Sequence, residues 1–303
     1  MDNISVEITG LSKNYKDVKA LDNINLSVEK GELFGFIGPD GAGKTTLFRI
    51  LVTLLIPDEG IAKVEGLDVI KDYKKIRNIV GYMPGRFSLY QDLSVEENLR
   101  FFASIFKTTI KENYWLIKDI YSQIEPFKAR LAGKLSGGMK QKLALSCALI
   151  HRPVVLFLDE PTTGVDAVSR MEFWEMLKRL KEHGITIVVS TPYMDEASLC
   201  DRVALIQKGR ILNIDTPEAI IDKYPFPLVS VRSDKMYELV DELRNFREMH
   251  SAYRFGEDIH YSASGDSIDK KELKSYLSSR GQKNIEIKDI RPCIEDCFMA
   301  LMK

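Results

Sequence analysis

A glycine-rich segment at residues 38–45, GPDGAGKT, constrains the fold of this chain more than any other feature. It fits the phosphate-binding pattern G-x-x-x-x-G-K-[ST]. The apolar run GELFGFIG leads into it, and the helically spaced TTLFRILVTLL follows it until Pro57 stops the helix. Strand, loop and helix thus come in the order that points backbone amides and a helix N-terminus at an anion.

The residue types in this loop suit a nucleotide phosphate. Glycines let the backbone wrap closely around oxygen atoms, Lys44 brings positive charge to the β- and γ-phosphates, and Thr45 offers a hydroxyl to Mg²⁺. A glycine-rich turn that only caps a helix is the alternative, and a lysine and a threonine both in register argue against it. The residues expected at ATP and Mg²⁺ are Gly38, Pro39, Asp40, Gly41, Ala42, Gly43, Lys44, Thr45 and Thr46.

A second candidate lies at residues 154–160, VVLFLDE, where a fully apolar strand ends in two acids. This puts both carboxylates at the carboxyl edge of the predicted sheet, beside the phosphate loop. We expect Asp159 to orient the Mg²⁺ shell and Glu160 to polarise the attacking water as the catalytic residue. Two solvated acids at a strand end are the alternative, which does not account for the apolar run.

The segment LSGGMKQ at residues 135–141 offers another anion site. Ser136, Gly137 and Gly138 present a hydroxyl and free amides at a predicted helix N-terminus. With the phosphate loop and the Asp-Glu strand end, this segment resembles the ATP-binding cassette (ABC) family over roughly residues 3–220. The later part resembles the C-terminal extension on cassettes of ABC-2-type exporters.

The resemblance implies a dimer. In the family, the signature loop of one subunit caps the γ-phosphate held by the other subunit, so ATP lies between two cassettes. Asp166 resembles the loop that communicates across that interface. Tyr15, expected in a loop after the first strand, resembles the aromatic residue on which adenine stacks; a surface tyrosine packed on the edge strands is the alternative.

Two positions depart from the family pattern. Gly85 stands where the family has a glutamine that touches Mg²⁺ and water, and Gln91 lies too far along to replace it. Pro192 stands where the family has a histidine that contacts the γ-phosphate, and proline has no donor to offer. His183 lies at the opposite end of that strand. We therefore expect good ATP binding but slow hydrolysis, in a heterodimer with one degenerate site or a homodimer with two weak ones.

The alternation of apolar strands and amphipathic helices predicts an α/β P-loop NTPase cassette over residues 1–222, with a mostly parallel sheet and an antiparallel β edge. A helical insertion at about residues 86–134 opens with Ser94 and Glu97, a capping box. Helices are also predicted at MDEASLC and from Cys293 onward. Pro225 and Pro227 mark the start of a small accessory α+β module, residues 223–303, expected to run strand, helix, strand, helix, strand, helix.

Composition narrows the setting. Lysine plus arginine (43) nearly balance aspartate plus glutamate (44), so the charge footprint of a nucleic-acid binder is missing. No run reaches the roughly 18 to 20 apolar residues that cross a bilayer, and no signal peptide is evident, which favours a cytosolic chain. The four cysteines are expected to be buried, reduced thiols.

The resulting hypothesis is an ATPase subunit, peripheral on the inner face of the membrane, that powers an exporter through separate multi-spanning permease subunits. ATP binding would close the two cassettes, and hydrolysis would reset them. A soluble ABC ATPase that acts on ribosomes or DNA is one alternative. A nucleotide-gated structural subunit with little turnover is another.

Overall fold

The structure is a computed structural model that describes residues 3–302. Residue contacts divide the chain into two units, Met1–Pro217 and Glu218–Lys303. The sequence placed this boundary after residue 222, at the other end of α7 (Pro217–Asp222). Each unit has its own hydrophobic core and is described by itself. None of the helices within residues 3–302 is long and apolar enough to span a membrane.

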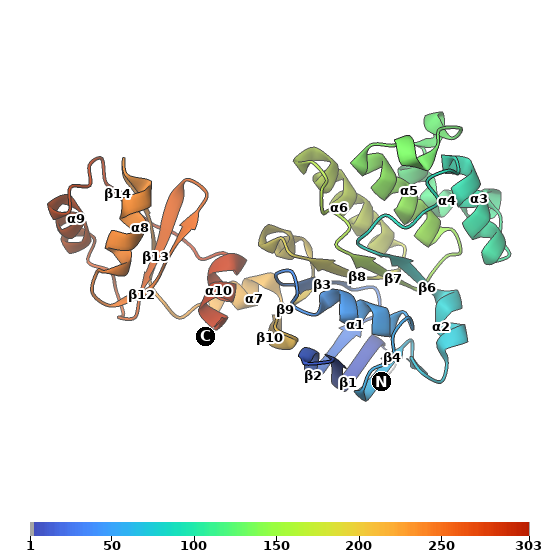
Figure 1. Ribbon diagram of the computed structural model, residues 1–303, viewed down its shortest axis with the longest axis horizontal. Helices are drawn as coiled ribbons and strands as arrows, with labels where there is room; N and C mark the ends of the chain where they lie inside the picture. The colour runs from blue at the N-terminus through green and yellow to red at the C-terminus, as the bar shows by residue number, and fades with distance from the viewer. Residues whose placement is uncertain (1–2, 303) are drawn as a thin grey trace. The chain divides into compact units, whose positions relative to one another are not determined.

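Two sheets form the frame of the first unit (Figure 1). The smaller is an antiparallel edge in the order β2-β1-β4-β5, and the larger is six-stranded and mainly parallel in the order β10-β9-β3-β8-β7-β6. Central strands of the larger sheet are apolar on both faces, as parallel strands covered by helices must be. The strands are β1 (Ile4–Tyr15), β2 (Val18–Glu29), β3 (Leu33–Ile37), β4 (Glu59–Val64), β5 (Leu67–Asp68), β6 (Val80–Met83), β7 (Val155–Asp159), β8 (Thr186–Thr191), β9 (Arg202–Gln207) and β10 (Arg210–Asp215).

Helix α1 packs between the two sheets, with contacts to β4 on one side and β7 on the other. The core at this layer includes Phe34, Phe36, Phe48 and Phe157, whose rings meet edge to face at centroid distances of 5.3 to 5.8 Å. Helices α5 and α6 cover the opposite face of the large sheet, and α3 and α4 pack on α5 (Figure 1). The helices are α1 (Lys44–Leu51), α2 (Tyr73–Ile79), α3 (Val95–Ile105), α4 (Ile110–Tyr121), α5 (Gly137–Leu149) and α6 (Ala167–Glu182).

The helical insertion begins where the capping box was predicted. Ser94 Oγ accepts a hydrogen bond from the Glu97 amide, and the Glu97 carboxylate accepts one from the Ser94 amide. The helix predicted at MDEASLC is wrong in type, because residues Met194–Leu199 form a 3-10 helix, η3, held in a short loop between β8 and β9. Two more 3-10 turns, η1 (Glu125–Phe127) and η2 (Ala132–Lys134), close the insertion.

The second unit is a four-stranded antiparallel sheet in the order β12-β13-β11-β14. Its core packs one sheet face against Leu239 and Leu243 of α8 and Leu273 and Leu277 of α9. The sequence missed one strand, since the stretch from residue 249 to 263 is a hairpin that turns at Gly256 (φ 60°). The elements are β11 (Leu228–Arg232), α8 (Met236–Arg244), β12 (Met249–Phe255), β13 (Asp258–Ala263), α9 (Lys270–Ser279), β14 (Glu286–Asp289) and α10 (Ile294–Leu301).

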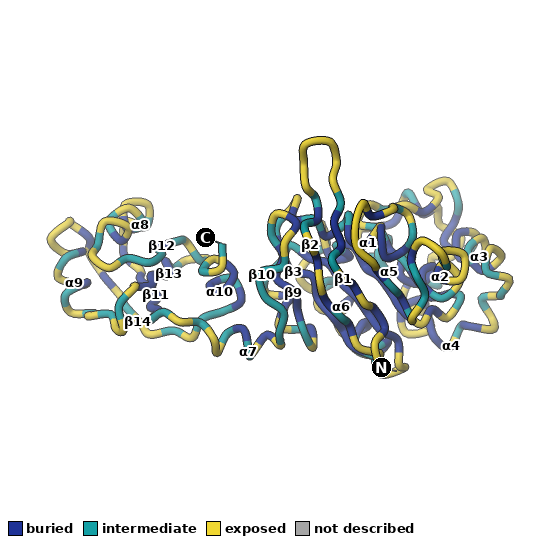
Figure 2. The backbone as a smooth tube through the Cα atoms, turned by 90° about the horizontal axis from the view of Figure 1, so that it is seen from below, coloured by how far each residue is buried: buried dark blue, intermediate teal, exposed yellow. Residues whose placement is uncertain are grey.

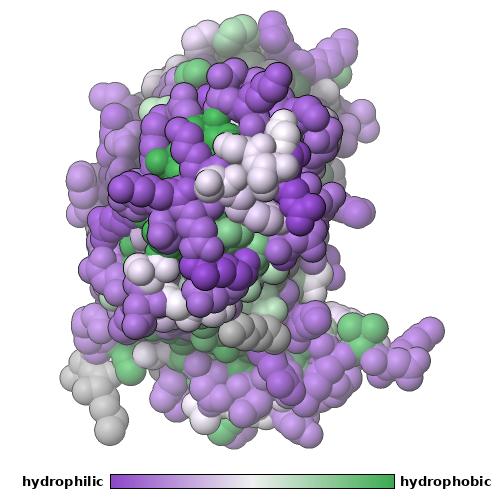
Figure 3. Space-filling model, turned by 90° about the vertical axis from the view of Figure 1, so that its left-hand side faces the viewer, coloured by the Kyte–Doolittle hydropathy of each residue, from purple (hydrophilic) through white to green (hydrophobic). Residues whose placement is uncertain are grey.

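The opposite face of this sheet is polar and meets α10. Along β13, Ile259 and Tyr261 point into the core while His260 points to the other face, because strand side chains alternate. There the His260 Nδ1 lies 2.7 Å from Asp296 Oδ1 of α10. The outer surface seen in Figure 3 is mainly hydrophilic, with apolar residues in small separate areas.

The cysteines are free thiols. Cys147, Cys200 and Cys297 are buried as expected, whereas Cys293, the N-cap of α10, is only half-buried. Burial raises the pKa of Cys297 to about 12 and that of Cys293 to about 11. These thiols are therefore protonated at neutral pH.

Candidate functional site

The phosphate loop joins β3 to α1, and its backbone explains its glycines. A Cβ on Gly38 would lie 2.1 Å from the Ile206 carbonyl oxygen, so no side chain fits there. Gly43 caps α1 at φ 106°, in the left-handed region, and a Cβ there would lie 2.4 Å from the Ala20 carbonyl oxygen. The backbone of the loop therefore requires glycine at positions 38 and 43, and it places its amides at the start of α1.

Lys44 is the centre of this loop. Its side chain is only 3% exposed, and its Nζ donates to the carbonyl oxygens of Gly38 at 2.7 Å and Pro39 at 3.0 Å. The same Nζ lies 3.2 Å from Glu160 Oε1. The charge predicted to meet the phosphates is thus held at the loop and faces the predicted catalytic acid.

Thr45 and Asp159 meet across the gap between α1 and β7. Thr45 Oγ1 donates to Asp159 Oδ1 at 3.1 Å, and Ser190 Oγ donates to the same oxygen at 2.7 Å. Asp159 is 2% exposed. Ser190, at the penultimate position of β8, was missed by the sequence reasoning; the signal for it was a polar residue directly after the apolar run Ile187–Val189.

Glu160 leaves β7 in a left-handed conformation (φ 50°). Its amide donates to the Ser190 carbonyl at 3.0 Å and to Ser190 Oγ at 3.1 Å. Its side chain keeps 23% exposure and turns toward Lys44. A non-glycine residue in this region is uncommon, and here β8 holds it there from the side.

Ser136, Gly137 and Gly138 begin α5, with Ser136 and Gly137 exposed. Ser136 Oγ accepts from the Met139 amide at 3.4 Å, as an N-cap does. A Cβ on Gly138 would lie 3.1 Å from Ser169 Oγ, so this turn lies against the start of α6. The Ser136 hydroxyl and the first amide of α5, that of Gly137, are therefore exposed to solvent.

Asp166 lies beside this turn as the N-cap of α6. Its Oδ1 accepts from the Ser169 amide at 3.0 Å. That backbone hydrogen bond lowers the pKa of Asp166 below its ordinary value. The structure therefore brings Asp166 and the segment 136–138 together on one exposed surface, although some 30 residues separate them in sequence.

Tyr15 is the last residue of β1, not part of a loop as expected, because the strand continues to a tight turn at residues 16–17. Its side chain is 43% exposed, near the tip of the exposed β1–β2 hairpin seen in Figure 2. The hairpin also reaches the phosphate loop near its turn, since the carbonyl of Ala20, the third residue of β2, lies against Gly43. The exposed ring of Tyr15 is therefore five residues from Ala20, which contacts the phosphate loop.

The two departures from the family pattern lie at the same site. A Cβ on Gly85 would lie 3.0 Å from the Asp159 carbonyl oxygen and 3.7 Å from Glu160 Cβ. Pro192 follows Thr191, whose carbonyl accepts from the Gly38 amide at 3.3 Å. Both positions border the phosphate loop and the acid pair, and neither carries a polar side chain. His183 is the C-cap of α6, at the far end of β8.

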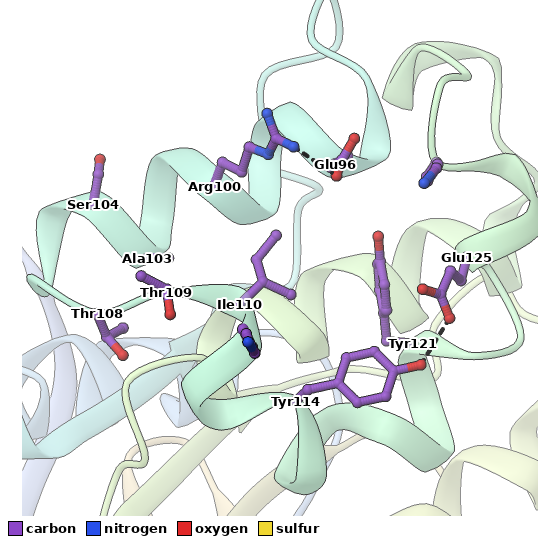
Figure 4. Close-up of a pocket in the computed structure, with 12 residues that line it drawn as sticks. Glu96, Arg100, Ala103, Ser104, Thr108, Thr109, Ile110, Tyr114, Tyr121 and Glu125 are labelled. Carbon is purple, nitrogen blue, oxygen red and sulfur yellow. Dashed lines mark hydrogen bonds and ion pairs between the residues drawn. The ribbon is translucent and has the colours of Figure 1, made fainter.

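The helical insertion carries two cavities. One, of about 430 Å³, lies between the large sheet and the insertion, with lining that includes Met83, Leu89, Phe102, Ile105 and Cys147. The other, of about 680 Å³, lies between α3 and α4 (Figure 4). On its α3 side Arg100 pairs with Glu96 at 2.9 Å, and on its α4 side the Tyr114 hydroxyl donates to Glu125 of η1 at 2.7 Å, so these polar groups satisfy one another. Neither cavity includes a residue of the phosphate loop or the acid pair.

Comparison with known proteins gives consistent matches. The family model "ABC transporter" matches residues 21–163. The probable multidrug ABC transporter ATP-binding protein YbhF of Escherichia coli K12 is 40% identical over 70% of this chain; the chain spans 37% of that protein. The Nod factor export ATP-binding protein I of Rhizobium sp. strain N33 is 32% identical, with 99% of this chain and 98% of that protein covered.

A solved structure agrees with this. The ATP-binding cassette MJ0796, a dimer in a post-hydrolysis state bound to ADP and Pi, superposes with a TM-score of 0.64 at 26% identity, over 70% of this chain and 98% of that one. Together with the phosphate loop, the acid pair and the segment 136–138, these matches show that the chain belongs to the ABC transporter family as a nucleotide-binding ATPase cassette.

Proposed function

We propose that this chain binds and hydrolyses Mg-ATP as one half of a cassette dimer and so powers a membrane exporter. The observation that carries this proposal is the convergence of Lys44, Thr45, Asp159 and Glu160 at the mouth of the phosphate loop. Positive charge, hydroxyl, metal-side carboxylate and water-side carboxylate come from two elements and meet within hydrogen-bonding distances. This is the set that phosphoryl transfer from ATP needs.

In this proposal Thr45 Oγ1 and Asp159 hold Mg²⁺. Hydroxyl and carboxylate oxygens are hard donors, and Mg²⁺ usually takes one or two such ligands together with phosphate oxygens and water. When bound, the ion would neutralise charge on the β- and γ-phosphates. Ser190 keeps Asp159 oriented, and Glu160 accepts a proton from water at its carboxylate.

The nucleotide site that this chain itself carries would bind ATP well but hydrolyse it slowly. Gly85 and Pro192 offer no polar side chain beside the acid pair, so two contacts on the γ-phosphate side are lost. Catalysis of phosphoryl transfer is mostly positioning and charge, and such losses could lower the rate by several powers of ten. Lys44 and the loop amides, which bind rather than cleave, remain in place.

The exposed turn at Ser136–Gly138 would complete the site of a second cassette. Its hydroxyl and helix N-terminus suit the γ-phosphate held by that partner. An intact turn together with a weakened own site favours a heterodimer over a homodimer. Asp166, next to the turn, would lie at the same interface.

The permease would contact the cavity between the large sheet and the insertion. Its lining is mainly apolar, and a groove of about 430 Å³ between helices suits a short amphipathic helix from a membrane subunit. Attachment there would place the chain at the inner face of the membrane. The names of the multidrug and Nod factor export relatives favour export, and residues 218–303 would act as an accessory module.

Two alternatives make different predictions. A soluble ABC ATPase would co-purify with ribosomes or nucleic acid, and the near-neutral net charge of −1 disfavours this. A nucleotide-gated structural subunit would bind Mg-ATP without useful turnover in any complex. Pull-down of the tagged chain from detergent-solubilised membranes tests the proposal: a multi-spanning protein and a second cassette are expected, and ribosomes alone would reject it.

A further inference from the structure

Glu196 is a buried acid outside the residues described so far. It lies in η3, just after β8, and is 2% exposed. A carboxylate that has lost water needs hydrogen-bond donors and a positive charge in its place. The contacts of the Glu196 carboxylate therefore identify the segments of the chain that it links.

Three groups from three parts of the chain meet at this carboxylate. Glu196 Oε1 accepts from Thr162 Oγ1 at 2.8 Å and from Arg170 Nε at 3.1 Å, and Oε2 accepts from Thr191 Oγ1 at 2.5 Å. Thr162 and Thr191 are each 1% exposed or less, so both contacts are shielded from water. In such surroundings hydrogen bonds to a charged group are strong.

Thr162 belongs to the loop that begins at Glu160. It lies two residues after Glu160, and the Val165 amide donates to its carbonyl at 3.2 Å. The segment from Glu160 to Asp166 thus bends around Thr162. A shift of this hydroxyl would move Glu160 on one side and Asp166 on the other.

Thr191 belongs to the strand end beside the phosphate loop. Its carbonyl accepts from the Gly38 amide, and its Oγ1 accepts from the Tyr193 amide at 3.1 Å. Arg170 stacks on the Tyr193 ring with its guanidinium carbon 4.2 Å from the centroid. The turn through Pro192 is therefore held by contacts on both sides. Glu196 links it to Thr162 of the Glu160 loop, in addition to the hydrogen bonds between the Glu160 amide and Ser190.

We propose that Glu196 is a positioning residue that holds the Glu160 loop in register with the phosphate loop. Its carboxylate accepts hydrogen bonds from Thr162 of the Glu160 loop and from Thr191 at the end of β8. Pro192, the next residue after Thr191, has no polar side chain that could make such a link. The inference rests on the proposed role of Glu160 in hydrolysis. It requires that loss of the link changes loop order and turnover while ATP binding at Lys44 persists.

Glu196→Gln tests this with Asp195→Asn as the matched control. Glutamine keeps the size but removes the charge and one of the two acceptor oxygens. Asp195 is the neighbouring acid and pairs with the same Arg170 at 3.2 Å, but it is 75% exposed. We expect Glu196→Gln to lower kcat roughly 10- to 100-fold with KM for Mg-ATP nearly unchanged, and Asp195→Asn to change neither.

Hydrogen exchange of the whole chain gives a second readout that needs no turnover. The Glu160 amide donates to Ser190 of β8, and the Thr163 and Val165 amides donate within the loop; we expect all three to exchange about tenfold faster in Glu196→Gln. Thr162→Val, which removes one hydroxyl and keeps the shape, should reproduce the change and decides the matter if Glu196→Gln does not fold.

Unchanged exchange at these amides in both variants would overturn the proposal, and so would an equal effect of Asp195→Asn. Residual turnover of the chain alone that survives Glu160→Gln would reject the role of Glu160 instead. The exchange result would then still report whether Glu196 orders the loop.

Discussion

Lys44 Nζ and Glu160 Oε1 lie 3.2 Å apart, while the same ammonium donates to the Gly38 and Pro39 carbonyls. A phosphate that binds in this loop must compete with these oxygens for Lys44. In the proposed mechanism the Glu160 carboxylate would act in two opposing ways: it would supply a base for hydrolysis, and its negative charge would repel the γ-phosphate.

Glu160→Gln should bind Mg-ATP several-fold more tightly than the wild type and lose roughly 10- to 100-fold of the residual turnover of the chain alone. The amide removes a negative charge near the phosphates and cannot take a proton from water. Isothermal calorimetry and phosphate release measure the two effects. Glu175→Gln, an exposed acid paired with Lys178, is the control, and unchanged turnover in Glu160→Gln would remove this residue from the mechanism.

Gly38→Ala should destabilise the first unit far more than Gly41→Ala. A Cβ on Gly38 meets the Ile206 carbonyl at 2.1 Å, and a backbone atom cannot move aside cheaply, so a loss above about 3 kcal/mol is expected. Gly41 has φ 76° but nothing within 4 Å of a Cβ, and its cost is that of the left-handed conformation, about 1 kcal/mol. Thermal unfolding of both variants decides this, and equal losses would contradict the loop geometry.

Asp296→Asn should weaken the second unit at neutral pH and flatten its loss of stability in acid. Burial raises the pKa of Asp296, but hydrogen bonds from His260, the Cys293 amide and Tyr253 lower it by more, so the pKa lies below 3.8. An acid whose pKa is lower in the folded than in the unfolded protein stabilises the fold at pH values above its unfolded pKa. This stabilisation is lost as the pH falls through the folded pKa. The effect therefore fades below about pH 4.

The loss at neutral pH should be roughly 2 kcal/mol, because His260 and Tyr253 would keep their burial without a charged acceptor. Melting temperatures across the acid range measure it. Asp289→Asn, an acid that is 76% exposed and pairs with Lys270, should have little effect. A wild-type and an Asp296→Asn curve that run parallel from pH 3 to 7 would contradict this assignment.

The sequence predicted the elements whose chemistry is local. The phosphate loop, the strand that ends in Asp159 and the capping box at Ser94 each lie within a few residues, where spacing determines structure. The departures from the family pattern at Gly85 and Pro192 could also be seen in the sequence, because the strand that precedes each position matched the family pattern.

What the sequence could not predict depends on distant partners. Glu196 looks like one more acid in MDEASLC, and only the meeting of Thr162, Arg170 and Thr191 shows that it is buried and linked. The β12–β13 hairpin was missed because a two-residue turn at Gly256 barely interrupts the strand pattern. Tyr15 was placed in a loop because the hairpin turn after it is equally short.

The most direct test of the account is steady-state Mg-ATP hydrolysis by the purified chain, alone and with the cassette that co-purifies with it. The account predicts ATP binding with slow residual turnover by the chain alone, and fast turnover with the partner that Ser136→Arg abolishes and Glu160→Gln leaves nearly intact. Robust turnover by the chain alone, lost in Glu160→Gln, would contradict it and show a self-sufficient homodimeric ATPase.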